Sequence, residues 1–310
     1  MTLRSHIAGT HPPADSAISI GTFDGVHLGH RHLLRTLTEA AQREGLTPVV
    51  LTFKNSPRSV LNPSAQLSYI TDLHTRLGLL HQPGIGSVVP VDFTRELSQL
   101  SAPDFVDALR MELGMKGLVV GPDFALGHRR QGDVTTLREM GNKAGFWVET
   151  VDNFLLDGSP VKSSAIRDML AQGQVEQVKR MLDRPFSLTG EVEAGDRRGR
   201  DLGFPTANLA PQPTMAVPGD GIYATWVTVE GTRHQGATSI GVRPTFGGGG
   251  ERRIETYLLD FSGDLYGKRM TLEFAERLRG ELAFSSVDAL VRQMKQDVEQ
   301  SRAVLSGERR

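Results

Sequence analysis

Cysteine is absent from the 310-residue chain, which excludes disulfide bonds, thiolate metal sites and a cysteine nucleophile. Net charge is nearly absent as well, because 35 lysine and arginine residues face 36 aspartate and glutamate residues. No overall field therefore draws the chain to nucleic acid or to an anionic membrane. The sequence also lacks an apolar run of the roughly 20 residues that span a bilayer, and residues 1–16 lack the apolar core of a signal peptide. We expect a cytoplasmic protein whose partners are small molecules.

The composition that remains is that of a globular protein, with 38% hydrophobic and 23% charged residues, and the length indicates about two domains. In the first half, strand patterns alternate with helix patterns. Strands are predicted at residues 17–22, 47–53, 86–91, 117–120 and 146–151. Helices are predicted at 70–80, 102–113 and 135–144, after a first helix that carries Leu33, Leu34, Leu37, Ala40 and Ala41 and stops at Gly45. This alternation predicts a parallel sheet with helices on both faces.

The pattern changes after residue 160. Two short helices are predicted at 164–171 and 175–182, and short strands at 186–192, 221–230, 235–239, 254–261 and 269–274. Several short strands at this spacing favour a barrel or a sandwich. A final amphipathic helix carries Leu290, Val291, Met294 and Val298, and residues 285–288 resemble a capping box. We place the domain boundary near residue 185, giving domains 1–184 and 185–310, and expect a flexible turn at Gly247–Gly250.

The run GTFDGVHLGH, from Gly21 to His30, stands where the first strand hands over to the first helix. A helix N-terminus presents unpaired N–H groups and partial positive charge, which suit a phosphate. Gly21 and Gly25 permit close backbone approach to a ligand. His27 and His30 are therefore expected to contact phosphates and to stabilise transition-state charge.

A second helix start lies in the run VKSSAIR, residues 161–167. Ser163 or Ser164 is a good N-cap, and Arg167 falls one turn later. This arrangement suits a leaving pyrophosphate. The simpler interpretation is an ordinary capped helix, and the presence of the histidine run favours the phosphate site.

Two features of the second half indicate a further nucleotide site. In the run GRDLGFPTANL, residues 199–209, glycines permit a loop that approaches phosphates, while Thr206 and Asn208 offer hard oxygen ligands suited to Mg²⁺. The strand at 254–261 places Glu255 and Tyr257 on one face. Glu255 is either a residue of the barrel rim or a functional acid.

The runs GTFDGVHLGH, VGPDFALG (residues 120–127) and SSAIR resemble the FMN adenylyltransferase module of bacterial bifunctional riboflavin kinase/FAD synthetases. The resemblance implies that FMN attacks the α-phosphorus of ATP with no covalent intermediate. His27 and His30 then stabilise that transition state, while Ser163, Ser164 and Arg167 hold the β,γ-phosphates. Asp123 is expected near the nucleotide or flavin. The residues implied to line the nucleotide site are Gly21, Phe23, Asp24 and Gly25.

The run GRDLGFPTAN, together with GVRPTF at 241–246, resembles the riboflavin kinase signature. The resemblance implies that Gly199, Gly203 and Pro205 lie near ATP phosphates. It also implies that Glu255 is the general base for the ribityl 5′-hydroxyl, and such help is worth roughly 10²–10⁴-fold in rate. Runs at 265–268 and 278–284 match the family too and are expected to shape the flavin side, so Arg279 is a flavin-binding candidate or a surface charge.

The resemblance covers about residues 16–305 and implies a Rossmann-like nucleotidylyltransferase domain followed by a small antiparallel β-barrel and a C-terminal helix. The implied function is FAD biosynthesis: riboflavin to FMN, then FMN to FAD with release of pyrophosphate. ATP and Mg²⁺ serve both steps, and no tightly bound prosthetic group is expected.

Three places depart from the family pattern. Asn55-Ser56-Pro57 replaces Pro-His-Pro, Lys162 replaces a serine, and Tyr257 replaces a histidine. Two other hypotheses stay open. One is a nucleotidylyltransferase with a different substrate, against which the PTAN run argues. The other is a flavin-binding or regulatory paralogue that has lost one or both activities, which the three departures favour.

Overall fold

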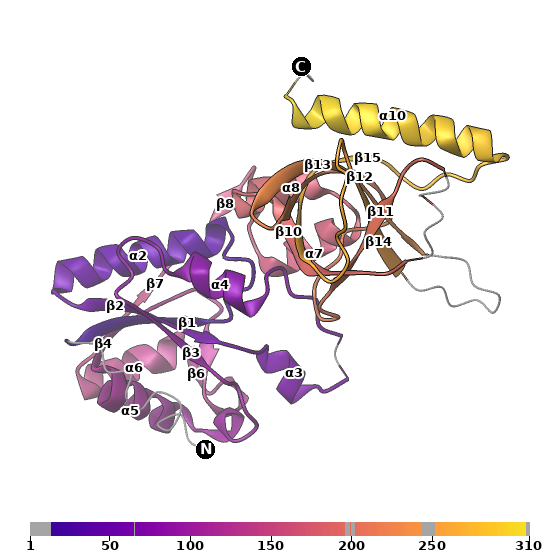
Figure 1. Cartoon of the computed structure of the whole chain (residues 1–310). Helices are drawn as coiled ribbons and strands as arrows, with labels where there is room; N and C mark the ends of the chain where they lie inside the picture. The colour runs from indigo at the N-terminus through magenta and orange to yellow at the C-terminus, as the bar shows by residue number, and fades with distance from the viewer. Residues whose placement is uncertain (1–13, 65, 196–198, 200–201, 243–251, 308–310) are drawn as a thin grey trace. The chain divides into compact units, whose positions relative to one another are not determined.

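The computed structural model describes residues 14–64, 66–195, 199, 202–242 and 252–307 (Figure 1). They pack into two compact units, one within Met1–Leu67 and Asp72–Lys162 and the other within Ser68–Thr71 and Ser163–Arg310. The predicted runs at 243–246 and 247–250, and residues 200 and 201, lie outside the described part. Within the described ranges, no helix is long and apolar enough to cross a membrane.

The first unit is built on a five-stranded parallel sheet in the order β3-β2-β1-β4-β7. Its strands are β1 (Ser16–Gly21), β2 (Thr47–Phe53), β3 (Ser87–Val91), β4 (Met115–Val120) and β7 (Trp147–Thr150). Its helices are α2 (Leu28–Glu44), α3 (Pro57–Leu61), α4 (Leu73–Leu80), α5 (Ala102–Leu113) and α6 (Val134–Ala144). The hairpins β5 (Ala125–Leu126) with β6 (Gly132–Asp133), and β8 (Leu155–Leu156) with β9 (Ser159–Pro160), were not predicted.

Both faces of this sheet are covered, as the alternating pattern predicted (Figure 1). Side chains alternate across a strand, so Ile18 and Ile20 pack into a core with α5 and α6, while Ala17 packs into a second core with α2. Gly45 ends α2 in a left-handed conformation, with φ of 66°, as predicted from the glycine stop. The prediction of a doubly covered parallel sheet is confirmed.

The predicted helix at 70–80 begins later than expected. Asp72 caps α4 by accepting a 2.9 Å hydrogen bond from Thr75 N. The residues before it are engaged elsewhere, since Tyr69 N donates to Thr214 O and Tyr69 O accepts from Ala216 N, both at 2.8 Å. Apolar spacing alone extended the prediction into this paired segment.

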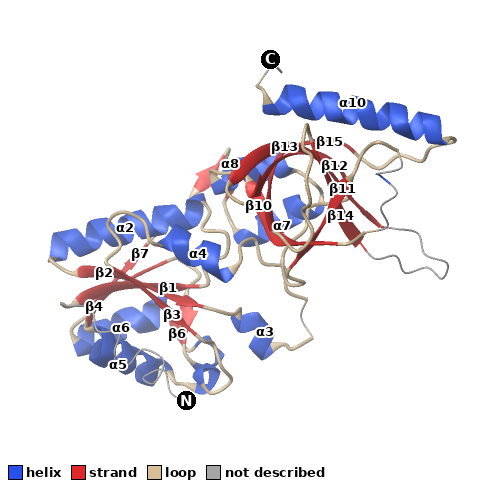
Figure 2. Cartoon of the chain, in the orientation of Figure 1, coloured by secondary structure: helices blue, strands red, loops and turns tan. Residues whose placement is uncertain are grey.

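The second unit is a closed barrel of six strands in the order β10-β11-β14-β13-β12-β15 (Figure 2). Its strands are β10 (Phe186–Glu193), β11 (Thr206–Pro211), β12 (Gly221–Val229), β13 (Thr232–Val242), β14 (Arg252–Leu258) and β15 (Arg269–Arg279). Its helices are α7 (Ser163–Ala171), α8 (Val175–Leu182) and α10 (Val287–Leu305). The expected barrel with a C-terminal helix is confirmed.

Helices α7 and α8 pack with the barrel rather than with the parallel sheet. Glu176 of α8 accepts a 3.1 Å hydrogen bond from Arg277 N of β15, which fastens the helix to the barrel wall. The compact units therefore divide at Lys162 and Ser163, earlier than residue 185. The boundary between the two sequence modules near residue 185 stays a prediction.

The strand β11 was missed by the sequence interpretation, which treated the PTAN run as a loop. The run does carry a strand signal, because Ala207 and Leu209 are buried while Thr206 and Asn208 alternate with them. At α10 the capping box is wrong in detail. Ser286 is the N-cap and accepts from Ala289 N at 3.2 Å, while Asp288 lies within the first turn.

Candidate active sites

The loop before α2 holds a strained backbone. Phe23, Gly25 and Val26 adopt left-handed φ angles of 49°, 84° and 40°, and a branched residue such as valine seldom tolerates this region. Each strained non-glycine residue costs on the order of 1–3 kcal/mol. Burial holds the loop in place, because Phe23 and Val26 are 2% and 0% exposed. The buried loop therefore fixes the position of His27 at the start of α2.

His27 and His30 form one unit at the N-terminus of α2. His27 is the N-cap, and its Nδ1 accepts a hydrogen bond from His30 N at 3.3 Å. The rings stack with centroids 3.7 Å apart and planes at 17°. Since Nδ1 of His27 accepts, the neutral ring carries its proton on Nε2. The structure brings these two predicted residues together.

Gly29 has a packing role that the sequence interpretation missed. A Cβ there would lie 2.8 Å from Val161 O and 3.1 Å from the His27 ring. The glycine between the two histidines is therefore required by space. The signal was the glycine between the two histidines of the run. At Gly21 the neighbouring space is filled by the Phe23 ring, 3.2 Å from a Cβ placed there.

Asp123 lies at the same edge of the sheet as the histidine loop, because β4 runs parallel and adjacent to β1. Strands β1 and β4 flank the point where the strand order reverses, and such sheets bind ligands outside the carboxyl ends at that point. The Asp123 side chain is 82% exposed and lies 3.4 Å from Lys162 Nζ. Arg130 Nη2 donates to its backbone oxygen at 2.7 Å. Asp24, another predicted residue, is buried in the histidine loop.

Ser163, Ser164 and Arg167 stand in the first two turns of α7, which begins at Ser163, so the two predicted N-cap serines are instead the first two residues of the helix. Arg167 Nε donates to Ser68 O at 2.7 Å. These residues belong to the second compact unit, whereas the histidines belong to the first. Their shared role at one nucleotide site therefore stays a prediction.

The residues that replace the family's Pro-His have local structural roles. Asn55 Nδ2 donates to Phe93 O at 2.9 Å, and Asn55 Oδ1 accepts from Phe93 N at 2.8 Å. Ser56 caps α3 by accepting from Arg58 N at 3.2 Å. These two side chains hold the segments that follow β2 and β3.

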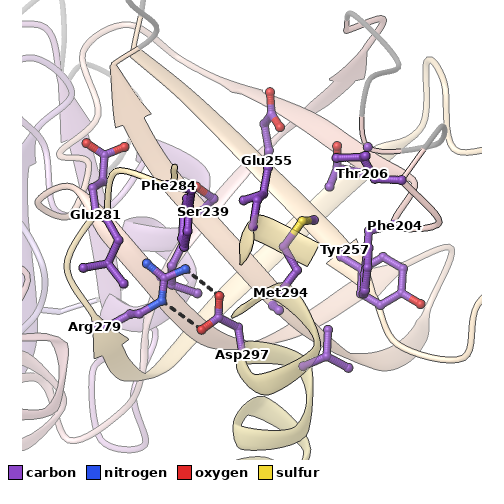
Figure 3. Close-up of a pocket in the computed structure, with 17 residues that line it drawn as sticks. Phe204, Thr206, Ser239, Glu255, Tyr257, Arg279, Glu281, Phe284, Met294 and Asp297 are labelled. Carbon is purple, nitrogen blue, oxygen red and sulfur yellow. Dashed lines mark hydrogen bonds and ion pairs between the residues drawn. The ribbon is translucent and has the colours of Figure 1, made fainter. Parts of the chain in front are cut away.

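In the second unit, a pocket of about 320 Å³ lies between the barrel and α10 (Figure 3). Cross-strand pairing sets its polar wall, because Asn208, Glu255 and Ser239 are register partners across β11, β14 and β13. Thr206 and Tyr257 form the next row. All of these except Asn208 line the pocket. Ser239 was not among the predicted residues, and its register opposite Glu255 is a long-range feature without a local signal.

Glu255 projects from β14 into this pocket (Figure 3). Among the described residues, no hydrogen bond or ion pair engages its carboxylate, so the group is available to accept a proton. Tyr257, which replaces the family histidine, packs edge to face against Phe204 with ring centroids 5.3 Å apart. Its ring therefore anchors the start of β11.

The PTAN run is positioned by its glycines. Gly199 O accepts from Phe204 N at 2.7 Å, and Gly203 is left-handed with φ of 85°. The backbone of Gly195 lies directly against the Asn208 amide, leaving no room for a Cβ. Thr206 and Asn208 stand two residues apart, on one face of β11. Within the described part of the chain, no three His, Cys, Asp or Glu side chains are grouped to hold a metal alone.

Arg279 is not a surface charge. Its Nε and Nη2 donate to Asp297 Oδ1 and Oδ2 at 2.9 and 2.6 Å, and the two side chains are 18% and 6% exposed (Figure 3). Gln293 donates to the same carboxylate at 3.0 Å. This fork fastens α10 to β15 at the pocket. Asp297 was missed, although an acid beside Met294 and Val298 on the apolar helix face was a visible signal.

Two family models match the chain. The FAD synthetase model matches residues 10–165 and the riboflavin kinase model matches residues 182–305. The two matches follow one another along the chain, and the predicted motifs fall inside them except for Ile166 and Arg167, which come just after the end of the first match.

Curated relatives match over almost the whole length. A bifunctional riboflavin kinase/FMN adenylyltransferase from Pseudomonas fluorescens is 38% identical over 290 residues, covering 92% of each chain. One from Escherichia coli K12 is 34% identical over 294 residues, covering 94% of this chain and 93% of the relative. One from Listeria monocytogenes is 33% identical over 290 residues, covering 93% and 92%.

A solved structure has the same fold. A Streptococcus pneumoniae chain described as a macrolide-efflux protein superposes with a TM-score of 0.87 at 30% identity, covering 97% of this chain and 98% of that one. The curated relatives do not share that description.

Proposed function

We propose residue roles on the premise that this chain belongs to the bifunctional riboflavin kinase/FMN adenylyltransferase family. It phosphorylates riboflavin to FMN with ATP, and it transfers an adenylyl group from a second ATP to FMN, giving FAD and pyrophosphate. The observation that carries this conclusion is that both family modules match one chain, in order, over residues 10–165 and 182–305.

For adenylyl transfer, we propose that His27 and His30 stabilise the charge that develops on the α-phosphate. An FMN phosphate oxygen attacks the α-phosphorus, and the bond to the β-phosphate oxygen breaks as pyrophosphate leaves. The stacked rings at the start of α2 support this role, because the helix dipole and preorganised N–H donors favour added negative charge. Ser163, Ser164 and Arg167 bind the β,γ-phosphates in this proposal, and Asp123 lies beside the flavin nucleotide.

For the kinase reaction, we propose Glu255 as the general base. The ribityl 5′-hydroxyl gives its proton to the carboxylate, its oxygen attacks the γ-phosphorus, and ADP leaves. The free carboxylate in a pocket of about 320 Å³ supports this assignment. Apolar side chains of Phe204, Leu290 and Met294 offer a surface for the flavin ring, and Arg279 lies at the same pocket.

The oxygen donors of β11 fit a magnesium ion. Thr206 and Asn208 share one face of the strand beside Glu255, and Mg²⁺ typically takes few protein oxygens plus substrate phosphates and water. When bound, the ion neutralises charge on the ATP phosphates. Gly199, Gly203 and Pro205 hold the backbone that presents these two side chains.

The three departures from the family pattern are compatible with activity at both sites. Asn55 and Ser56 bond to neighbouring backbone, and Tyr257 packs against Phe204. Neither Asn55-Ser56 nor Tyr257 stands at a position to which we assign chemistry. Because both reactions consume ATP, we place the protein in the cytoplasm, where that co-substrate is made and used.

A product assay tests the proposal. Purified protein is incubated with ATP, Mg²⁺ and either riboflavin or FMN, and the flavins are separated by chromatography. We expect FMN before FAD from riboflavin, and FAD directly from FMN. Flavin binding without turnover in both reactions would contradict the enzyme assignment and favour the paralogue.

A further inference from the structure

The backbone just before Lys162 packs against the first turn of α2, which carries the two histidines. Val161 is buried, and its N–H donates to Phe154 O at 3.0 Å. Its carbonyl oxygen lies 2.8 Å from the point where a Cβ on Gly29 would stand. The residue before Lys162 therefore touches the first turn of α2, between His27 and His30.

From that position the lysine side chain reaches the neighbouring strand end. Lys162 Nζ lies 3.4 Å from Asp123 Oδ2, and Asp123 follows β4, the parallel neighbour of β1. The amine thus joins the segments that leave the two strands at the reversal of the strand order. Ligands of open parallel sheets bind at this edge.

The pair between Lys162 and Asp123 is easily exchanged. The side chains are 47% and 82% exposed, and 3.4 Å is long for a charge-assisted contact. Exposed pairs of this kind contribute little to stability. Arg130 also donates to the Asp123 backbone, at 2.7 Å, so that positive charge gathers around this acid. A phosphate that binds here can therefore draw the Lys162 ammonium away from Asp123 at a small cost in free energy.

We propose that Lys162 is a phosphate-binding residue of adenylyl transfer, an assignment that rests on the proposed function. On substrate entry the ammonium leaves Asp123 and binds a phosphate group of ATP or of FMN. At the position where the family pattern has a serine hydroxyl, this chain offers a charge. The bond to phosphate is charge-assisted and is therefore stronger than a neutral hydroxyl contact.

The test is the kinetics of FAD formation from FMN in K162Q, K162S and K162R, with ATP and FMN varied separately. For K162Q and K162S we expect the KM of one substrate to rise about tenfold with kcat within about twofold, since uniform binding is lost. K162R keeps the charge and restores that KM. The difference shrinks with added salt. A rise confined to ATP assigns the phosphate to ATP, and one confined to FMN assigns it to FMN.

Lys116 supplies a matched control. Its Nζ lies 3.7 Å from Asp15 Oδ2, and the two side chains are 51% and 57% exposed. Lys116 stands at the start of β4, whereas Asp123, the partner of Lys162, follows the end of that strand. K116Q should leave both KM values unchanged. If the parent chain makes no FAD from FMN, the proposed function fails. If the parent makes FAD and K162Q keeps both KM values, or K116Q shifts them equally, the assignment of Lys162 is wrong.

Discussion

Gly29 allows the two histidines to lie close together because it has no side chain. The Val161 carbonyl and the His27 ring fill the space that a side chain would need. The two imidazoles stack at 3.7 Å, and Gly29 places no Cβ against the His27 ring. Gly25, by contrast, is required for its left-handed φ of 84°.

G29A should therefore damage adenylyl transfer. The added methyl group must push the His27 ring or the Val161 carbonyl, and displacements near 1 Å can cost on the order of 10²-fold in rate. We expect kcat/KM for FMN to FAD to fall about 100-fold while riboflavin phosphorylation stays within twofold. G78A is the matched control, because Gly78 lies in α4 with nothing within 4 Å. A G29A chain with parental FAD formation would contradict the packing argument.

Helix α10 is held to the barrel by two bidentate ion pairs of different burial. Arg279–Asp297 is 18% and 6% exposed, whereas Arg302–Asp260 is 47% and 73% exposed. The hydrogen bonds from Arg302 hold the pKa of Asp260 below its ordinary value. Only the buried pair lines the pocket. A change at Arg302–Asp260 therefore affects only the attachment of the helix, whereas a change at Arg279–Asp297 affects the pocket as well.

D297N should destabilise the barrel and weaken riboflavin binding. It leaves a buried guanidinium without its countercharge, which costs about 2–3 kcal/mol after allowance for partial exposure. The measurement is urea unfolding followed by Trp226 fluorescence in a W147F background, since the chain has only two tryptophans, together with the KM for riboflavin. D260N should change neither quantity appreciably. Equal effects of D297N and D260N would contradict this account.

The barrel interior contains an ionisable group whose burial is testable. Burial raises the pKa of Tyr223 to about 12, and its hydroxyl donates to Gly219 O. Between pH 10 and 12 the folded chain keeps this proton while the unfolded chain loses it. The unfolded state then binds fewer protons, so stability falls as pH rises through this window.

Y223F should remove that part of the alkaline loss. It retains the ring, which packs edge to face on Phe274 at 5.4 Å, and it gives up one hydrogen bond worth ~1 kcal/mol at neutral pH. We expect the urea midpoint of the W147F, Y223F chain to fall less between pH 10 and 12 than that of W147F alone. Parallel curves would show that Tyr223 titrates normally.

The predictable part of the fold is the part with a repeating pattern. Periods of 2 and 3.6 residues located β2, α5 and α8 at their observed bounds. The predictions failed where a contact with a residue far along the chain sets the local structure, as for Tyr69 before α4. They also failed at β11, where the glycines and the proline of residues 199–205 concealed the alternation of buried and exposed side chains. At the sites, motif residues could be recognised, but Asp297, Ser239 and the packing of Gly29 depend on contacts far along the chain.

For the whole molecule, we expect two separable reactions in one chain. The histidines belong to the first compact unit and Glu255 belongs to the second. Riboflavin phosphorylation supplies FMN, and adenylyl transfer consumes it. Two variants that each lack one reaction can therefore complement each other through free FMN.

The most direct test mixes E255Q and H30A with riboflavin, ATP and Mg²⁺ and follows the flavins by chromatography. Alone, H30A should stop at FMN, and E255Q should convert supplied FMN to FAD but leave riboflavin unchanged. The mixture should make FAD from riboflavin. FAD from riboflavin by H30A alone, loss of FMN adenylylation in E255Q, or a mixture that stops at FMN would contradict the assignment of two separable sites.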